Sequence, residues 1–268
     1  MFASFSFETL PAPRRRDRRR FRRDSRIFVS NTRRWGIKAI DIHIAFFADQ
    51  TEQAKHTQMA QAFSHVANSD MPYVLLPKHC EYEPMLADYR LKQPEPRDIL
   101  PQAAMKILHA VVSKNELNLR NLKAAIIAPR MNNEAYHTAH DLSRRVKSLA
   151  LCGGNDTAYM AQQLRREYGV SILEQPSATQ QSDTDVYILF DATPGNIHPR
   201  PGSIVLELGN DWCLALRDSV THIKQVIWHY PEHALRDLPA GVCKQRAIAL
   251  LLQSGVLSLD DLEIKQLL

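Results

Sequence analysis

Short apolar segments alternate with amphipathic helical patterns from residue 122 onward, and this alternation constrains the fold more than any other feature of the sequence. A continuous apolar run bounded by turn residues fits a strand that is buried on both faces. The predicted strands are 122–128, 148–152, 170–173, 185–190 and 203–208, with 226–228 as a sixth, and helices begin near Asn132 or Asn133 and at Asp156. Such strands, separated by helices, are typical of β-α-β units around a parallel sheet. Because crossovers between parallel strands are right-handed, a doubly wound, mostly parallel Rossmann-like sheet is the leading topology.

The residues on either side of this region predict further parts. Residues 37–47 alternate apolar and polar side chains as a strand does, and Thr51 is placed to cap a helix that runs to about residue 68. Prolines make residues 77–100 a loop-rich stretch, which ends at a helix beginning near Pro101. We therefore expect an α/β protein in four parts: a basic Arg-rich arm at 1–35, an N-terminal α/β region at 36–121, a Rossmann-like domain at 122–230 and C-terminal helices at 231–268.

The net charge of +5 is concentrated at the N-terminus. Residues 1–35 hold eleven arginines against Glu8, Asp17 and Asp24, so the remaining chain is mildly acidic. Neighbouring guanidinium groups attract phosphates, which predicts binding of a polyanion (RNA, DNA or an anionic membrane surface) through Arg14–Arg34. The alternative is that this arm docks on the acidic body of its own or a neighbouring subunit, as in a homo-oligomer.

Cysteine spacing and hydropathy indicate the compartment. The four cysteines are scattered, and no C-x-x-C pair occurs. This usage is typical of reduced thiols in the cytoplasm. No apolar run is long enough for a membrane span, and no apolar segment follows the arginines as it would in a signal peptide. We therefore expect a cytoplasmic protein.

A glycine turn after the predicted strand 148–152 is the sharpest candidate for a ligand site. Gly153 and Gly154 are followed by Asn155 and the start of a helix. A glycine permits a tight turn, and the N–H groups at a helix N-terminus can bind a pyrophosphate. Glu174 ends the next predicted strand, where an acidic side chain would accept a hydrogen bond from a ribose hydroxyl. These four residues form the predicted nucleotide-binding turn.

Residues 148–209 also resemble the NAD(P)-binding domain shared by shikimate dehydrogenase, glutamyl-tRNA reductase and related enzymes. The resemblance is carried by the strand before Gly153-Gly154, by Gly169-Val170, by the segment from Asp185 through Asp191-Ala192-Thr193-Pro194, and by Pro201-Gly202 with the strand that follows. It implies NAD or NADP as the cofactor, with the phosphates at Gly153 and Gly154. It also implies that the loop of Thr193, Pro194 and Gly195 approaches the nicotinamide.

A second register of the sheet is open at this point. The strand at 123–128 can be the central one, and Pro129-Arg130-Met131-Asn132 then faces the ligand crevice. In that register the glycine fingerprint of dinucleotide-binding sheets is absent.

Histidine and cysteine patterns were weighed as metal or nucleophile sites. His137, His140 and Asp141 share one helix face, and His229-Tyr230-Pro231-Glu232-His233 matches H-x-x-E-H. Pro231 belongs at a helix start, so His229 would lie outside the helix and the second pattern fails. Cys80 follows His79, but adjacent residues of an extended strand point to opposite faces. We expect no metal ion and no activated thiol.

Two classes of function fit these observations, besides the polyanion binding considered above. One is a Rossmann-like protein that binds a nucleotide or small metabolite without catalysis, and the other is an NAD(P)-dependent oxidoreductase similar to shikimate dehydrogenase. The crevice between the two halves is the default ligand site. Hydride transfer needs a proton donor or acceptor there. Lys78, His79, Asp88 and Lys92 are the clustered candidates, and no motif supports them.

Overall fold

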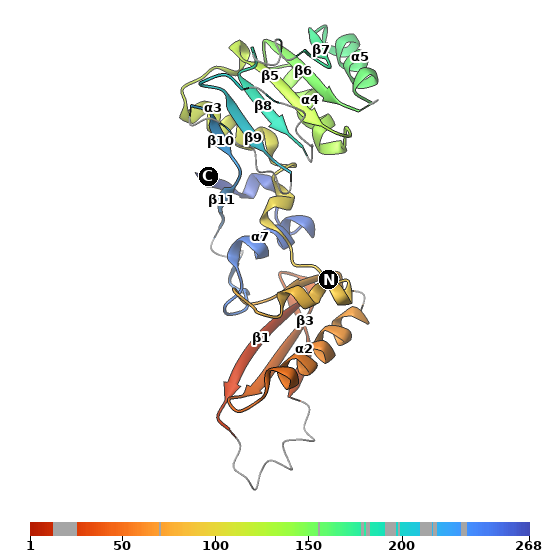
Figure 1. Ribbon diagram of the computed structural model, residues 1–268, viewed down its shortest axis with the longest axis vertical. Helices are drawn as coiled ribbons and strands as arrows, with labels where there is room; N and C mark the ends of the chain where they lie inside the picture. The colour runs from red at the N-terminus through yellow and green to blue at the C-terminus, as the bar shows by residue number, and fades with distance from the viewer. Residues whose placement is uncertain are drawn as a thin grey trace. The chain divides into compact units, whose positions relative to one another are not determined.

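The computed structural model describes residues 1–12, 26–69, 71–154, 156–177, 180, 183–190, 197, 199–209, 216, 219–231 and 235–268. The chain folds into two compact units, and each is built from two separate segments (Figure 1). The N-terminal unit contains Met1–Pro96 and Tyr230–Asp261, and the Rossmann-like unit contains Arg97–His229 and Leu262–Leu268. The expected boundary after residue 230 lies within one residue of the change from His229 to Tyr230, whereas no change of unit follows residue 35 or 121, and the first one falls between Pro96 and Arg97.

A six-stranded parallel sheet forms the core of the Rossmann-like unit. Its strands are β5 (Lys123–Ala128), β6 (Ser148–Gly153), β7 (Ile172–Glu174), β8 (Val186–Leu189), β9 (Ile204–Glu207) and β10 (Thr221–Ile223). They lie side by side in the order β10-β9-β8-β5-β6-β7. Counted along the chain this is 3-2-1-4-5-6, the order of dinucleotide-binding sheets. The predicted doubly wound α/β fold is confirmed.

β5 occupies the centre of this sheet. It pairs with β6 on one side and with β8 on the other, so the strand order reverses between β5 and β8. Residues 124–128 are all buried, as expected for a strand covered on both faces. The second register considered for the sequence is therefore the one adopted.

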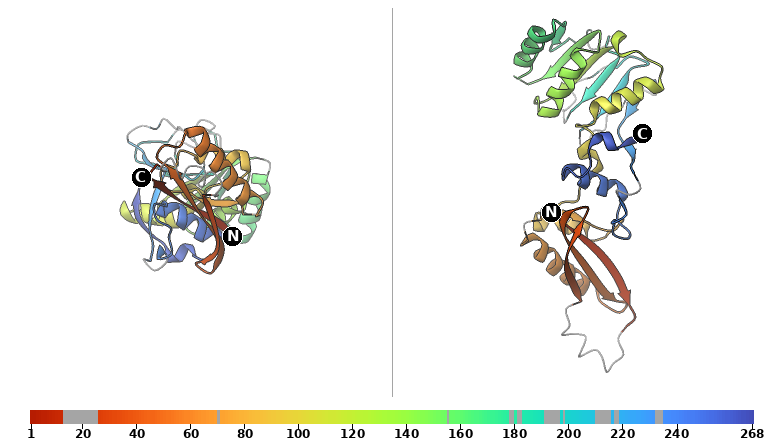
Figure 2. Two further views of the ribbon diagram at one scale, coloured as in Figure 1. Left: turned by 90° about the horizontal axis from the view of Figure 1, so that it is seen from below. Right: turned by 180° about the vertical axis from the view of Figure 1, so that it is seen from behind.

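Helices cover the β5–β7 half of the sheet. α4 (Asn133–Ser143) packs on β5 and β6, and α5 (Asp156–Tyr168) packs on β6 and β7 (Figures 1 and 2). α4 begins where the sequence predicts, because the side chain of Asn132 accepts a hydrogen bond from the backbone N–H of Ala135. α3 (Ala104–Lys114) precedes the sheet and buries Ile107, Leu108 and Val111.

Two expectations for this unit were wrong. The sixth strand of the sheet is β10, whereas β11 (Val226–His229) pairs antiparallel with β12 (Glu263–Leu267) in a separate ribbon. β12 lies where we expected a helix. It follows the fully buried Leu262, and its backbone bonds with β11 replace those of a helix.

The N-terminal unit contains a four-stranded sheet in the order β2-β3-β1-β4. Its elements are β1 (Phe2–Leu10), β2 (Ile27–Arg34), β3 (Ile37–Phe47), α2 (Glu52–Ala67), β4 (Tyr73–Leu75), a 3-10 helix at Glu83–Tyr89 and α7 (Lys244–Gln253). α2 packs along one face of the sheet, where Met59 and Phe63 join Phe5, Ile42 and Ile44 in the core (Figure 1). The predicted N-cap at Thr51 is confirmed.

The prediction that residues 1–35 form a single arm is wrong, because both ends of this segment are strands of the four-stranded sheet. β1 is an inner strand, paired in parallel with β3 and β4, and Phe2 and Phe5 are fully buried. β2 forms a hairpin with β3, and the positive φ angles at Trp35 (51°) and Gly36 (75°) are those that a two-residue hairpin turn requires.

Some arginines of this segment make contacts within the folded unit, and others lie outside the described residues. The Arg34 guanidinium pairs with the Asp41 carboxylate at 2.7 Å, and Arg26 lies 3.5 Å from the centre of the Phe47 ring. The dense run from Arg14 to Arg23 lies outside the described residues.

Candidate functional site

The point where the strand order reverses lies at the carboxyl ends of β5 and β8. Ligands of doubly wound sheets bind outside the strand ends at this place. Here β5 ends at Ala128, and a turn from Pro129 to Asn132 leads into α4. The larger unit is Rossmann-like by this topology.

Arg130 is the charged residue of that turn. It is exposed, and its guanidinium has no ion-pair partner among the residues that the structure describes. The N-terminus of α4 adds a partial positive charge of about half a unit. Glu134 in the first turn of α4 offsets part of this charge. The surplus remains positive and suits an anionic ligand group.

Gly153 and Gly154 lie one strand away from β5, at the end of β6. A Cβ atom added to Gly153 would lie 2.2 Å from the carbonyl oxygen of Ala128, and one added to Gly154 would lie 2.7 Å from that of Pro129. The backbone N–H of Gly154 donates to the Pro129 carbonyl at 3.1 Å. The two glycines thus let the turn after β6 lie directly against the turn after β5.

The other predicted cofactor residues are spread along this edge of the sheet. Glu174 ends β7 at the sheet's margin, where its carboxylate pairs with Arg165 at 2.5 Å. Asn155, Thr193, Pro194 and Gly195 lie outside the described residues. The structure therefore brings Gly153 and Gly154 to the β5 turn and leaves Glu174 two strands from β5.

A buried carboxylate at the end of β9 was missed by the sequence analysis. The Glu207 side chain has no exposed surface, and its Oε2 lies 2.8 Å from Nε2 of His222 on β10. Its Oε1 lies 3.6 Å from the Arg97 guanidinium and accepts no hydrogen bond within the described part of the chain. An acidic residue inside the apolar run Ile204-Val205-Leu206-Glu207-Leu208 was the signal that could have found it.

Nε2 of His222 donates a hydrogen bond to this carboxylate. Burial lowers the pKa of His222 below its usual value, and the hydrogen bond to Glu207 opposes that shift. Register pairing places Glu207 beside Leu189, the last residue of β8. The pair is therefore one strand from the point where the order reverses.

Some of the predicted candidates for proton transfer in the N-terminal unit lie together. Lys78, His79 and Cys80 line a cavity of about 510 Å³ together with Lys55 and Tyr82. Burial raises the pKa of the Cys80 thiol, which disfavours the reactive thiolate. Asp88 and Lys92 are exposed, and no hydrogen bond between Asp88 and either lysine occurs among the described residues.

The histidine patterns form no metal site in the described part of the chain. The ring of His140 contacts the Tyr168 hydroxyl and the Glu167 carboxylate rather than His137. His233 lies outside the described residues. In the same ranges, no helix is long and apolar enough to cross a membrane.

No protein-family model matches the chain, and no curated protein matches its sequence. One solved structure that matches is L-tryptophan dehydrogenase from Nostoc punctiforme, with 15% identity and a TM-score of 0.31 over 77% of this chain and 61% of that one. The chain thus spans about three fifths of that enzyme.

Two shikimate dehydrogenases also match. The enzyme from Listeria monocytogenes, solved with shikimate and NAD, has 9% identity and a TM-score of 0.29 over 61% of this chain and 67% of that one. The enzyme from Aquifex aeolicus has 9% identity and a TM-score of 0.29 over 76% and 77%. The group that residues 148–209 resemble is thus among the structural neighbours, and the fold assignment itself rests on the strand order.

Proposed function

We propose that the Rossmann-like unit binds a nucleotide, or another small metabolite that carries a phosphate, at the carboxyl ends of β5 and β8. The observation that supports this is the strand order, which reverses beside the N-terminus of α4 and beside Arg130, an exposed residue without an ion-pair partner in the described part of the chain. An arginine fork and a helix N-terminus both recognise phosphate oxygens.

The turn after β5 favours a side-chain contact over a backbone cradle. A pyrophosphate in a dinucleotide-binding sheet approaches the backbone closely because glycines line the first turn. The turn here reads Pro129-Arg130-Met131-Asn132 and contains no glycine. The phosphate would therefore be held by the Arg130 guanidinium, and NAD and NADP are two candidates among several nucleotides.

Replacing Arg130 with alanine is expected to weaken nucleotide binding by at least about tenfold, because a charge-assisted hydrogen bond contributes about 1.5–3 kcal/mol. The measurement is calorimetric titration with NAD, NADP, ATP and ADP-ribose, preceded by a thermal-shift screen. Arg166→Ala is the matched control, since Arg166 is an exposed arginine in the last turn of α5. A lack of binding by all four at millimolar concentration, or equal weakening by both variants, would contradict the proposal.

The second candidate function is an NAD(P)-dependent oxidoreductase, and the pair of His222 and Glu207 favours it. A neutral histidine oriented by a carboxylate can move a proton, which reduction of a carbonyl group requires. We expect NAD(P)H oxidation with at least one member of a panel of 2-oxo acids and ketones. Turnover should fall about a hundredfold or more in His222→Asn, with unchanged nucleotide affinity. No turnover across the panel, or turnover that survives this change, would count against catalysis and leave the binding proposal intact.

A further inference from the structure

A cavity of about 660 Å³ lies at the opposite edge of the Rossmann-like unit, beside the starts of β5 and β6. It is open to solvent and is lined by the C-terminal ends of α3 and α4 and by the 3-10 helix Leu119–Asn121. Its lining residues are His109, Val112, Ser113, Leu117, Asn118, Leu119, Arg120, Arg144 and Arg145. They include three arginines and no carboxylate.

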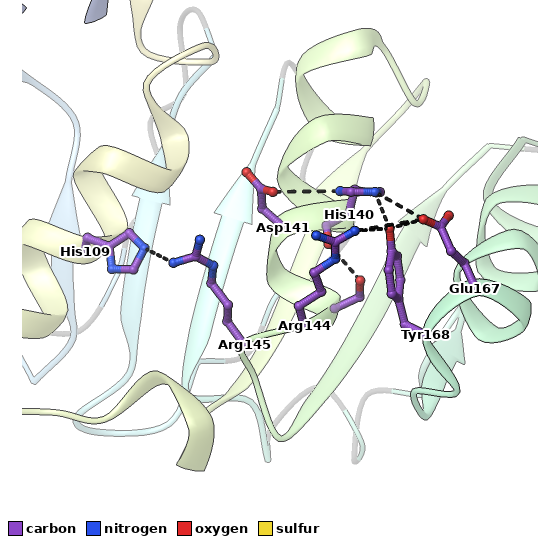
Figure 3. A network of polar contacts seen from close by, with 8 residues as sticks. His109, His140, Asp141, Arg144, Arg145, Glu167 and Tyr168 are labelled. Atoms are coloured by element: carbon purple, nitrogen blue, oxygen red, sulfur yellow. Dashed lines mark hydrogen bonds and ion pairs between the residues drawn. The ribbon is translucent and has the colours of Figure 1, made fainter. Parts of the chain in front are cut away.

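The three guanidinium groups differ in how they are held. Arg144 donates to the Tyr168 hydroxyl at 2.7 Å and lies 4.5 Å from the centre of its ring, which fixes its position (Figure 3). Its nearest carboxylate, that of Glu167, is 4.0 Å away. Within the described part of the chain, the Arg145 guanidinium donates to a single group, a ring nitrogen of His109 at 3.2 Å. Arg120 has no side-chain partner within the described ranges.

The local charge remains positive in spite of the two helix ends and of the Glu167 carboxylate, which lies 4.0 Å from Arg144. A helix C-terminus carries about half a negative charge, so α3 and α4 together offset about one of the three guanidinium charges. One surface arginine at a helix C-terminus balances the partial negative charge of that end. Three arginines around one cavity carry more positive charge than the two helix ends offset. The cluster repels itself unless an anion enters.

We propose that this cavity is an anion site that binds phosphate groups, separate from the nucleotide site at the other end of α4. Its volume is that of a small-ligand pocket. Arginine forks bind phosphate oxygens in pairs, and Ser113 and Asn118 add polar side chains to the lining. The same chemistry is presented by a small phosphorylated molecule and by the backbone of a nucleic acid.

His109 makes this site sensitive to pH. Burial lowers the pKa of His109, Arg145 lowers it further, and Asp141 on α4 acts in the opposite direction. His109 is therefore neutral near pH 7 and accepts a hydrogen bond from Arg145. A bound phosphate adds negative charge next to the ring and raises the pKa again, so binding takes up a proton. Affinity should consequently rise as the pH falls through the interval between the two pKa values.

The test uses the full chain with serine in place of every arginine from Arg14 to Arg23, so that the arginine run cannot bind the probes. The probes are tripolyphosphate in calorimetry and a fluorescent oligothymidine about 20 nucleotides long in anisotropy, at about pH 6 and pH 8 and low salt. The double variant Arg120→Ala/Arg145→Ala should weaken binding by about tenfold or more. Arg166→Ala, outside the lining, is the matched control, and Arg130→Ala should leave this binding unchanged. Arg120→Gln, at an exposed position, serves if the double variant fails to fold.

Each outcome is decisive. Saturable tripolyphosphate binding that the double variant weakens indicates a small phosphorylated ligand, and binding of the oligothymidine alone with the same weakening indicates a nucleic acid backbone. Binding to neither probe, or binding that the double variant and Arg120→Gln leave unchanged, overturns the proposal. Binding lost in Arg130→Ala but kept in the double variant would assign the phosphate to the nucleotide site instead.

Discussion

Removal of residues 1–12 is expected to unfold the N-terminal unit. β1 lies between β3 and β4, so its loss leaves both neighbours without their backbone partner. Phe2, Ala3 and Phe5 are fully buried. Burial of one large apolar side chain contributes about 1.5–3 kcal/mol, and whole domains are stable by about 5–15 kcal/mol. The single change Phe5→Ala should already cost about 3–5 kcal/mol.

Circular dichroism and limited proteolysis of the N-terminal unit measure this effect. The control replaces every arginine from Arg14 to Arg23 with serine and keeps β1 and β2 intact. That variant should stay folded. It also tests polyanion binding by the arginine run, because a deletion of residues 1–35 would remove β1 and unfold the unit at the same time. Retention of a protease-resistant N-terminal unit after removal of residues 1–12 would contradict the assigned role of β1.

Gly153→Val is expected to destabilise the Rossmann-like unit by about 3 kcal/mol in the absence of any ligand. The added side chain begins 2.2 Å from the carbonyl oxygen of Ala128, and a backbone atom of a central strand cannot move aside as a flexible side chain would. Ala158→Val is the matched control because Ala158 is an exposed residue in the first turn of α5. It should cost less than about 1 kcal/mol.

Urea unfolding of both variants separates two roles for the glycine. A glycine needed only for a phosphate would leave the ligand-free protein as stable as the wild type. A glycine needed for the contact between the turns after β5 and β6 lowers the free energy of unfolding without ligand. Equal stability of Gly153→Val and the wild type would therefore refute the packing role.

Apolar periodicity predicted the buried strands well, because a strand covered on both faces leaves a continuous run in the sequence. It could not predict their lateral order, since neighbouring strands of a parallel sheet are distant in the chain. The choice between β5 and β6 as the central strand therefore needed the structure. β10 was missed because Thr221-His222-Ile223 is short and only its last residue is fully apolar.

The high positive charge of the N-terminal segment led us to overlook the apolar pattern of a strand there. The arginine surplus led us to treat residues 1–35 as one arm, although Phe2, Phe5 and Phe7 precede the first arginine. At the site, the sequence analysis assigned Gly153 to a phosphate contact, and the structure adds a close approach of the Ala128 carbonyl as a second reason for a glycine at this position. A phosphate and a neighbouring carbonyl both exclude a Cβ atom, and sequence does not distinguish them.

The interleaving of the two units has a consequence for the order in which the chain becomes structured during synthesis. The six strands of the parallel sheet are all made before the ribosome reaches α7. β11 is made soon after β10, but its partner β12 follows only after α7, which belongs to the other unit. During that interval β11 presents unpaired backbone groups and the side chain of Trp228, which is buried in the finished fold. The nascent chain is then most exposed to wrong strand pairing.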